Sequence, residues 1–328
     1  MNIPGLHSIN GKVWTALLAC IATVVLFISA SAPDSRATEV LQTRFPSPDA
    51  AAEALVAATK ADDLKTMLAI LGPGSEDVIS SGDSVADNAS RDKFVASYEQ
   101  KHSLEAKKAG TMILHIGADD WSMPTPIVKK GNSWGFDIKK GKQEILNRRI
   151  GRNELHVIDV IDAYVEAQHE YASKDFRGGG RVEFAQRFIS SPGSHDGLYW
   201  EAREGEKQSP LGPLIAQAAK EGYPAGGNLS PFHGYYFKIL RGQGNHAKGG
   251  PYKYVVKGKM ILGFALVAYP AEYGNSGVMT FVVNQEGTVF EKNLGKNTRR
   301  LAEAITTYNP DKSWKKVKVL ETSTQKNP

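Results

Sequence analysis

Between residues 235 and 292, short runs of aromatic and β-branched residues alternate with turn-forming glycine, asparagine and proline. Strands favour the former side chains, and the interrupting residues favour reversals of the chain. The pattern therefore predicts an antiparallel meander followed by a short helix over 298–306. Its strands are expected over 235–240, 252–256, 260–269, 278–284 and 288–292.

A long helical pattern precedes this meander, over residues 141–174. Its inward positions recur at helical spacing and are Val157, Ile161, Tyr164, Gln168 and Tyr171. We expect this broad face to pack on the meander. Gly151 is expected to break or kink the helix, with Asn153 as a new N-cap. Shorter helices are predicted over 184–189 and 211–221.

Residues 45–140 show helices first and strands afterwards. Ser47 is a good N-cap for the first helix, and Gly131-Asn132 separates two short strands as a tight turn. The predicted helices cover 50–59, 63–71 and 84–101, and the strands 111–116, 126–130 and 133–138. Helices ahead of a hairpin with Trp134 and Phe136 resemble nuclear-transport-factor-2-like (NTF2-like) or cystatin-like domains, which implies a small curved antiparallel sheet.

The whole chain is therefore expected to be α+β with two domains, at 45–140 and 141–320. Residues 33–44 are polar and predict a linker, and 321–328 predict a disordered tail. The second domain combines one long helix with one antiparallel sheet.

The N-terminus has the pattern of a secretory signal, which we place at residues 1–32. Lys12 precedes an apolar run over 13–30, and small residues follow it. Cleavage after Ala30, after Ala32, or at Ser35-Arg36-Ala37 fits this pattern. An uncleaved membrane anchor and lipidation at Cys20 are the alternatives. We expect an exported protein, periplasmic or associated with the cell envelope, with membrane contact only through this N-terminus.

Composition adds few constraints. The chain is 41% hydrophobic and 23% charged, which suits globular domains, and its net charge of +5 comes from intermixed Lys, Arg, Asp and Glu. Mixed charge and expected export argue against a nucleic-acid partner. Cys20 is the only cysteine and lies in the leader, so the remaining chain forms no disulfide and has no thiol chemistry.

Two aromatic loops are the main candidate binding residues. His195 and Asp196 lie in a Gly/Pro-rich loop that ends at Trp200. His233 precedes the first strand of the meander, and three tyrosines lie near strand ends: Tyr235, Tyr269 and Tyr273. Loops of this kind build binding sites. The simpler interpretation, which we favour, is a turn-capping aspartate beside a solvated histidine, and tyrosines that pack.

Asp119, Asp120 and Trp121 form the candidate pocket of the N-terminal domain. The alternative, which we prefer, is a turn with Trp121 covering the core.

The acidic residues of the long helix share a face, as a glycosidase pair would, but a solvated helix face explains them better. No metal-ligand spacing, serine elbow or phosphate loop occurs, so we predict no catalytic residue, metal or cofactor.

Two resemblances cover the chain. The segments 167–173, 234–237, 264–270 and 276–287, with Gly287 placed to open a last hairpin, resemble the heads of type IV pilins and pseudopilins. A pilin leader is missing ahead of the helix, so pilus assembly by a buried N-terminal helix is not expected. The segments 70–83, 144–155, 188–200, 233–240 and 263–284 resemble an uncharacterised bacterial family, domain of unknown function 2950. That resemblance implies an exported envelope protein without an established activity.

The turn after the long helix departs from that family, in which it is often acidic and glycine-rich like a calcium loop. Here Asp175 and the later Glu183 are the only hard oxygen donors in 175–183. Calcium needs about six or more oxygens. We therefore expect any such site to be lost, and calorimetric calcium binding at micromolar concentration would contradict this.

The sequence favours a non-enzymatic binding or assembly factor whose partner is an unidentified envelope protein or polymer. The alternative is a hydrolase of an envelope polymer that uses His195, Asp196 and His233. That alternative requires these side chains to converge in one cleft.

Overall fold

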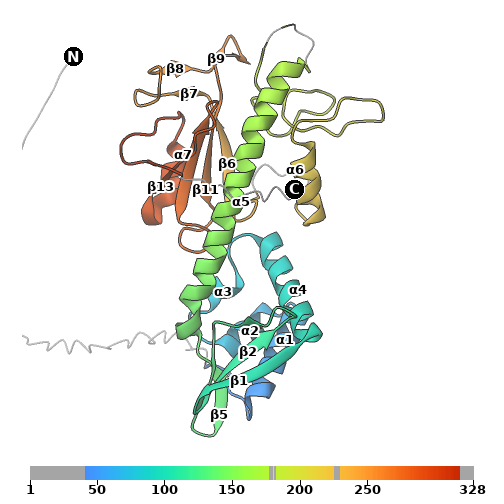
Figure 1. Cartoon of the computed structure of the whole chain (residues 1–328), viewed down its shortest axis with the longest axis vertical. Coiled ribbons are helices and arrows are strands. Elements are labelled where there is room, and N and C mark those ends of the chain that lie inside the picture. Colours follow the sequence, from blue (N-terminus) through green and yellow to red (C-terminus); the bar gives the residue numbers. More distant parts are fainter. Residues whose placement is uncertain (1–40, 177–179, 181, 225–229, 318–328) are drawn as a thin grey trace, which may run out of the picture. The chain divides into compact units, whose positions relative to one another are not determined.

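The computed structural model describes residues 41–176, 180, 182–224 and 230–317. Helices and antiparallel strands build this part of the chain, as the α+β prediction requires (Figure 1). Within these ranges, no helix is both long and apolar enough to cross a membrane. The predicted signal lies outside the described residues.

Side-chain caps hold the starts of the first two helices, at Ser47 as predicted and also at Asp63. The Ser47 side chain accepts a hydrogen bond from the Ala50 amide, and the Asp63 carboxylate accepts one from the Thr66 amide. Such caps satisfy amides that have no partner within the helix. The helices are α1 (Pro48–Lys60), α2 (Leu64–Leu71), α3 (Glu76–Ile79) and α4 (Ser84–Gln100).

A 5-stranded antiparallel sheet follows these helices. Its strands are β1 (His102–Lys108), β2 (Thr111–Ile116), β3 (Trp121–Ser122), β4 (Ile127–Lys130) and β5 (Ser133–Phe136). The order is β1-β2-β4-β5, with β3 also paired to β2. β1 was not predicted, because its charged and largely exposed sequence HSLEAKK lacks a strand pattern. β4 and β5 confirm the predicted hairpin around Gly131 and Asn132.

One hydrophobic core joins these helices to the sheet. Helices α1 and α2 supply Leu55 and Met67, and the sheet supplies Leu114 and Ile127, all at most 4% exposed. Ile138, the first residue of the next helix, belongs to the same core. The long helix is thus attached to this core from its first turn.

That long helix, α5 (Ile138–Lys174), runs 37 residues without interruption. The predicted break at Gly151 and the new cap at Asn153 are wrong. A glycine inside a helix costs only about 1 kcal/mol relative to alanine. Tertiary contacts on both sides outweigh that cost: the Arg149 guanidinium donates to the Asp77 and Val78 carbonyls, and buried Asn153 donates to the Ser276 carbonyl.

The second large sheet is also 5-stranded and antiparallel, in the order β14-β13-β12-β11-β6. Its strands are β6 (Tyr235–Leu240), β11 (Ala265–Pro270), β12 (Met279–Asn284), β13 (Phe290–Asn293) and β14 (Lys315–Lys316). All six residues of β11 are buried, so both sheet faces are covered there. Helix α5 contacts β12, and α7 (Thr298–Ala304), which follows the 3₁₀ turn η1 (Gly295–Asn297), contacts β11.

Two short ladders accompany this sheet: β7 (Gly242–Gln243) with β8 (Tyr252–Lys253), and β9 (Val255–Val256) with β10 (Lys259–Met260). The predicted strand 252–256 is therefore divided between two ladders. The predicted strand 260–269 is divided too, because Gly263 has a φ of 143° that only glycine adopts readily.

The predicted helix over 184–189 is wrong. Phe184 forms a bridge with Met260 and Ile189 forms one with Tyr199, so this segment is extended. In this extended form the apolar side chains of the segment pack in the second core, together with the inward face of α5 and the second sheet. The short helix predicted over 211–221 is confirmed as α6 (Gly212–Lys220).

Candidate functional site

An apolar pocket lies among α5, α6 and β6. Its cavity volume is about 170 Å³. Aliphatic side chains of α5 and α6 line it together with six aromatic residues: Tyr164, Phe188, Tyr223, Phe232, Tyr236 and Phe237. Aromatic side chains of this kind provide much apolar contact area in binding sites.

Helix α6 forms one wall because its two ends are fixed. Leu211, directly before it, is buried in the second core, and Gly222 ends it with a φ of 93°. The Tyr223 amide then donates to the Ala218 carbonyl, which turns Tyr223 back against the helix. The helix therefore presents Leu214 and Ile215 to the pocket.

A buried polar cluster adjoins the pocket at Tyr223. The Tyr223 hydroxyl donates to Asp83 Oδ2 at 2.9 Å, and the Gly234 amide donates to the same oxygen at 2.8 Å. Asp83 Oδ1 accepts the Ala86 amide and so caps α4. Asp83 is 2% exposed, so one buried carboxylate connects the start of α4 to the end of the pocket.

His233 belongs to the same cluster. Its Nε2 lies 3.1 Å from Glu221 Oε2, and its ring centroid lies 4.4 Å from that of His156. Its backbone φ is 49°, which is unusual outside glycine and asparagine. Burial lowers the pKa of His233, the charge of His156 and Arg152 lowers it further, and Glu221 and Asp83 oppose this. Nδ1 of His156 is buried and has no hydrogen-bond partner among the described residues.

The lowered pKa of His233 predicts a loss of stability on acidification. Because the unfolded chain takes up this proton first, stability decreases as pH falls below the ordinary value of 6.5 and the loss is complete below the folded pKa. His233→Asn tolerates the positive φ and cannot titrate, so its melting temperature should fall less between pH 7 and pH 5. Thermal melts of both chains across this range measure the difference. Equal falls in the two chains would contradict the prediction.

The first candidate loop is held by bonds among its own residues and by the Tyr171 hydroxyl of α5, which donates to the His195 carbonyl. Asp196 accepts hydrogen bonds from the Ser191 amide, the Ser191 hydroxyl and the Ser194 hydroxyl. Burial raises the pKa of Asp196, but these bonds and Arg187 outweigh burial and lower it overall. The His195 ring packs on buried Trp200 at 4.4 Å between centroids. The turn-capping interpretation fits Asp196, and His195 is packed rather than solvated.

His195 and Asp196 have partners different from those of His233. Among the described residues, no hydrogen bond, ion pair or ring contact joins that loop to His233, which contacts Glu221, His156 and Tyr223. The hydrolase alternative requires the three side chains to converge in one cleft. None of the contacts among the described residues supports that convergence.

The candidate tyrosines lie outside the pocket lining, with Tyr235 and Tyr269 in strands of the second sheet. Tyr235 is fully buried and donates to the Met279 carbonyl at 3.0 Å. Tyr269 is 8% exposed, and Tyr273 bridges to Gly277 in a turn. The pocket instead uses their neighbours Tyr236 and Phe237, which sequence reasoning did not single out.

Asp119, Asp120 and Trp121 form a turn at the start of β3. Asp120 has a φ of 52° and pairs with Lys101 and His115. Trp121 is 41% exposed and has the Arg148 guanidinium 5.8 Å from its ring centre. The turn is thus present, whereas the expectation that Trp121 covers the core is wrong.

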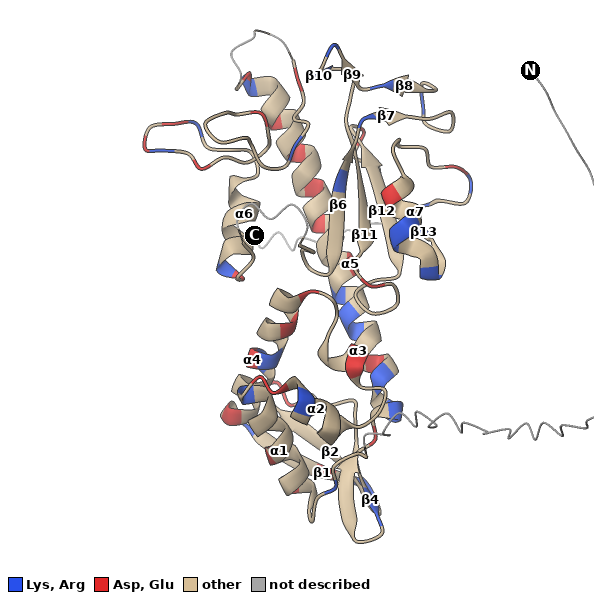
Figure 2. Ribbon diagram, turned by 180° about the vertical axis from the view of Figure 1, so that it is seen from behind, with Lys and Arg blue, Asp and Glu red and all other residues tan. Residues whose placement is uncertain are grey.

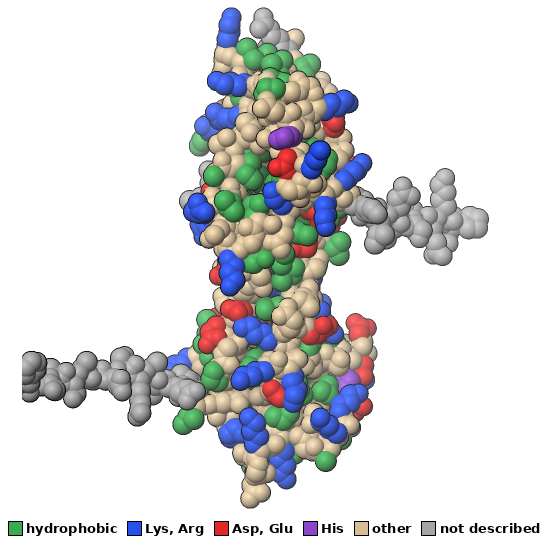
Figure 3. All heavy atoms as spheres, turned by 90° about the vertical axis from the view of Figure 1, so that its left-hand side faces the viewer, with side chains coloured by type: hydrophobic (Ala, Val, Ile, Leu, Met, Phe, Trp, Pro, Cys, Tyr) green, Lys and Arg blue, Asp and Glu red, His purple; other side chains and the backbone are tan. Residues whose placement is uncertain are grey.

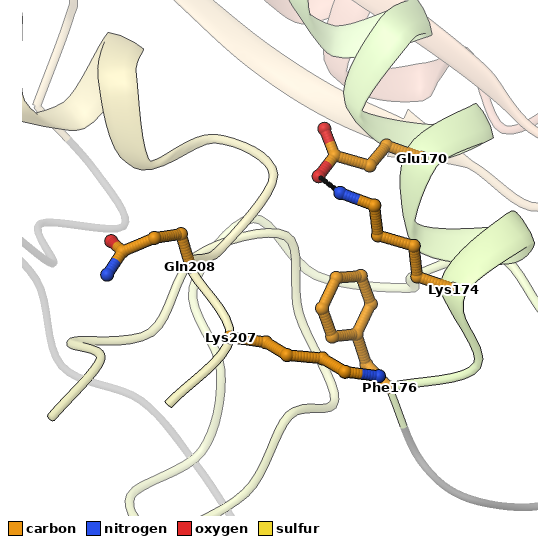
Figure 4. Close-up of a pocket in the computed structure, with 5 residues that line it drawn as sticks. All are labelled: Glu170, Lys174, Phe176, Lys207 and Gln208. Carbon is orange, nitrogen blue, oxygen red and sulfur yellow. Dashed lines mark hydrogen bonds and ion pairs between the residues drawn. The ribbon is translucent and has the colours of Figure 1, made fainter. Parts of the chain in front are cut away.

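A second hollow, of about 560 Å³, lies at the C-terminal end of α5 (Figure 4). Lys174 pairs with Glu170 at 2.6 Å, and Lys207 reaches across toward Phe176, at 5.6 Å from its ring centre. Glu170 and Lys174 pair with each other, and the remaining charge is carried by the long side chain of Lys207, so the hollow offers little fixed geometry for a ligand. Nearby, Asp175 Oδ2 accepts the Gly180 amide.

The described residues contain no group of three or more His, Cys, Asp or Glu side chains placed to hold a metal ion. Residues 177–179 and 181 of the predicted lost calcium loop lie outside the described residues. The loss of that site stays a prediction.

These features define an α+β protein with two cores, one continuous helix and an apolar pocket beside a buried carboxylate and two histidines. The chain belongs to the family described as protein of unknown function (DUF2950), whose model matches residues 42–317. A search of curated proteins and a search of solved structures each gave no match.

Proposed function

We propose that this chain is an exported envelope protein without enzymatic activity, and that it binds a partner protein through the pocket under α6. The observation that carries the proposal is the apolar, aromatic-lined cavity of about 170 Å³. The transfer of a partner's apolar side chain from water into such a cavity is favourable.

The size of the cavity decides between a small molecule and a side chain. Sites that enclose a whole small-molecule ligand usually measure about 300–1,000 Å³. The cavity of about 170 Å³ falls below this range. It suits a single large apolar side chain from a partner, of the kind that anchors protein interfaces.

The polar groups near the pocket also favour binding over hydrolysis. Asp83 is engaged by three donors, and Asp196 by its own loop. A general base needs a free position within hydrogen-bond reach of a substrate. The hydrolase alternative therefore has weaker support than the binding function.

Export and finer fold class belong to the same proposal. The apolar run over 13–30 supports export. Contact between α5 and β12 in an antiparallel meander supports the pilin-like interpretation of the C-terminal half. Helices packed on a small sheet support the NTF2-like or cystatin-like interpretation of the N-terminal half.

The binding function is tested by photo-crosslinking in an envelope fraction of producing cells. A photoreactive amino acid replaces Ala219, which is exposed on α6 and does not line the pocket. Ile215→Trp fills the pocket, while Leu301→Trp adds the same side chain on α7. We expect one protein crosslink that persists with Leu301→Trp and falls about tenfold with Ile215→Trp.

Two outcomes would count against this function. A crosslink that still forms in Ile215→Trp would show that the partner binds α6 outside the pocket. The absence of any protein crosslink would contradict the proposal that a partner protein binds here. Release of fragments from an envelope polymer by the purified chain would favour the hydrolase alternative instead. Circular dichroism of each variant checks that the fold is retained.

A further inference from the structure

Exposed apolar side chains gather at one place in the described chain. Nine large hydrophobic residues are exposed among the described residues, and four of them lie on or beside the β9–β10 hairpin. These four are Val182 (61% exposed), Val256 (38%), Ile261 (38%) and Leu262 (50%), and we call them the tip patch. The other five are Leu41, Leu64, Trp121, Leu155 and Leu301.

Hydrogen bonds bring the members of the tip patch together. The Phe184 amide donates to the Met260 carbonyl at 2.8 Å, and the Gln186 side chain donates to the Gly258 carbonyl at 2.8 Å. The segment that carries Val182 therefore runs beside the hairpin. Lys259 also pairs with Glu183 at 3.2 Å.

Strand alternation explains why Val256 faces outward. In the β9–β10 ladder Val255 pairs with Met260, which is fully buried, and Val256 pairs with Lys259. Successive side chains point to opposite faces of a ladder, so Val256 and Lys259 face away from the core. The second core already holds Met260, so the outward position of Val256 has no packing role there.

Lysines surround the tip patch. Lys253, Lys257 and Lys259 lie in the same hairpin segment and are exposed, and among the described residues Lys253 and Lys257 form no ion pair. Figure 3 shows hydrophobic and basic side chains side by side at the upper end of the view, where Figure 1 labels β8 and β9. Figure 2 shows basic residues on the ribbon of this region.

We infer that the tip patch docks on the surface of an anionic phospholipid bilayer. Apolar side chains enter the boundary between headgroups and acyl chains, and the lysines meet the lipid phosphates. The positive charge of the lysines around the patch complements the negative charge of the lipid phosphates, which favours a bilayer as the occupant. A second copy of the chain would bring lysines against lysines, which disfavours self-association. The surface is separate from the pocket under α6 and does not depend on the proposed function.

The test uses the chain from Val40 onward, since Val40–Pro328 is one compact unit and the apolar run over 13–30 would bind lipid by itself. This chain has no cysteine, so Leu262→Cys offers a single site for an environment-sensitive dye. Leu301→Cys, equally a surface leucine, is the matched control. Vesicles of phosphatidylglycerol with phosphatidylcholine are compared with phosphatidylcholine alone.

We expect a blue shift of the dye at 262 but not at 301, with the anionic vesicles only. Vesicle flotation of Ile261→Ser/Leu262→Ser and of Lys253→Glu/Lys257→Glu should be about tenfold weaker, while Leu155→Ser/Leu301→Ser binds normally. High salt should weaken binding. Equal binding to both vesicle types, no shift at 262, or a shift that follows dimer formation in sedimentation would each overturn the inference.

Discussion

Asp83→Ala should lower the free energy of unfolding by at least about 3 kcal/mol, because each of two buried donors left without a partner costs about 1–3 kcal/mol and a lost N-cap about 1 kcal/mol. The donors are the Tyr223 hydroxyl and the Gly234 amide, and the capped amide is that of Ala86. Asp83 is 2% exposed, so water cannot replace the carboxylate without entering the core. Urea denaturation of the chain from Val40 measures the loss.

Two further variants separate the parts of this effect. Asp63→Ala also removes an N-cap, but the cap is exposed and bonds only to Thr66, so its loss should be much smaller. Tyr223→Phe removes one donor and should cost about 1 kcal/mol. If Asp83→Ala and Asp63→Ala destabilised the chain equally, the buried hydrogen bonds of Asp83 would contribute nothing to the free energy of unfolding.

Gly141→Ala should destabilise the chain by about 3 kcal/mol, although alanine is the better helix former. An added Cβ at Gly141 would lie 2.6 Å from Thr125 Cα, closer than any real contact. The obstacle is backbone and cannot rotate away. The first turn of α5 would have to move off the loop before β4, and Ile138 would leave the first core.

Gly151→Ala is the matched control on the same helix. Nothing lies within 4 Å of a Cβ at this position, so the substitution should stabilise the chain by about 0.5–1 kcal/mol. Urea denaturation compares both variants with the parent chain. Shifts of the same sign at 141 and 151 would show that helix propensity, rather than the contact with Thr125, governs Gly141.

Local chemistry made the helix starts and the longest strands predictable. Ser47 and Asp63 cap the helices that follow them, and β6, β11 and β12 carry the aromatic and β-branched side chains that strands favour. β1 was missed because an exposed strand needs no apolar pattern. The helix expected at 184–189 failed because bridges to distant residues hold that segment extended.

The site was less predictable because its residues meet only in three dimensions. Asp83 and Tyr223 are 140 positions apart, and neither stands in a motif that predicts their hydrogen bond. The aromatic residues of the pocket come from α5, from the segments around α6, and from β6. Their neighbours Tyr235 and Tyr269 have the same residue type and a similar pattern, so the sequence alone could not separate packing from lining.

The unbroken course of α5 has a mechanical consequence. At about 1.5 Å per residue, its 37 residues form a rod of roughly 55 Å with its first turn in the first core and its C-terminal half in the second. Because bending this helix would distort its hydrogen-bonded turns, α5 is a stiff connection between the two cores. Gly151→Pro would remove an intrahelical hydrogen bond and kink α5 between the residues that enter the first core and those that enter the second, so it should destabilise the chain by about 3 kcal/mol in urea denaturation.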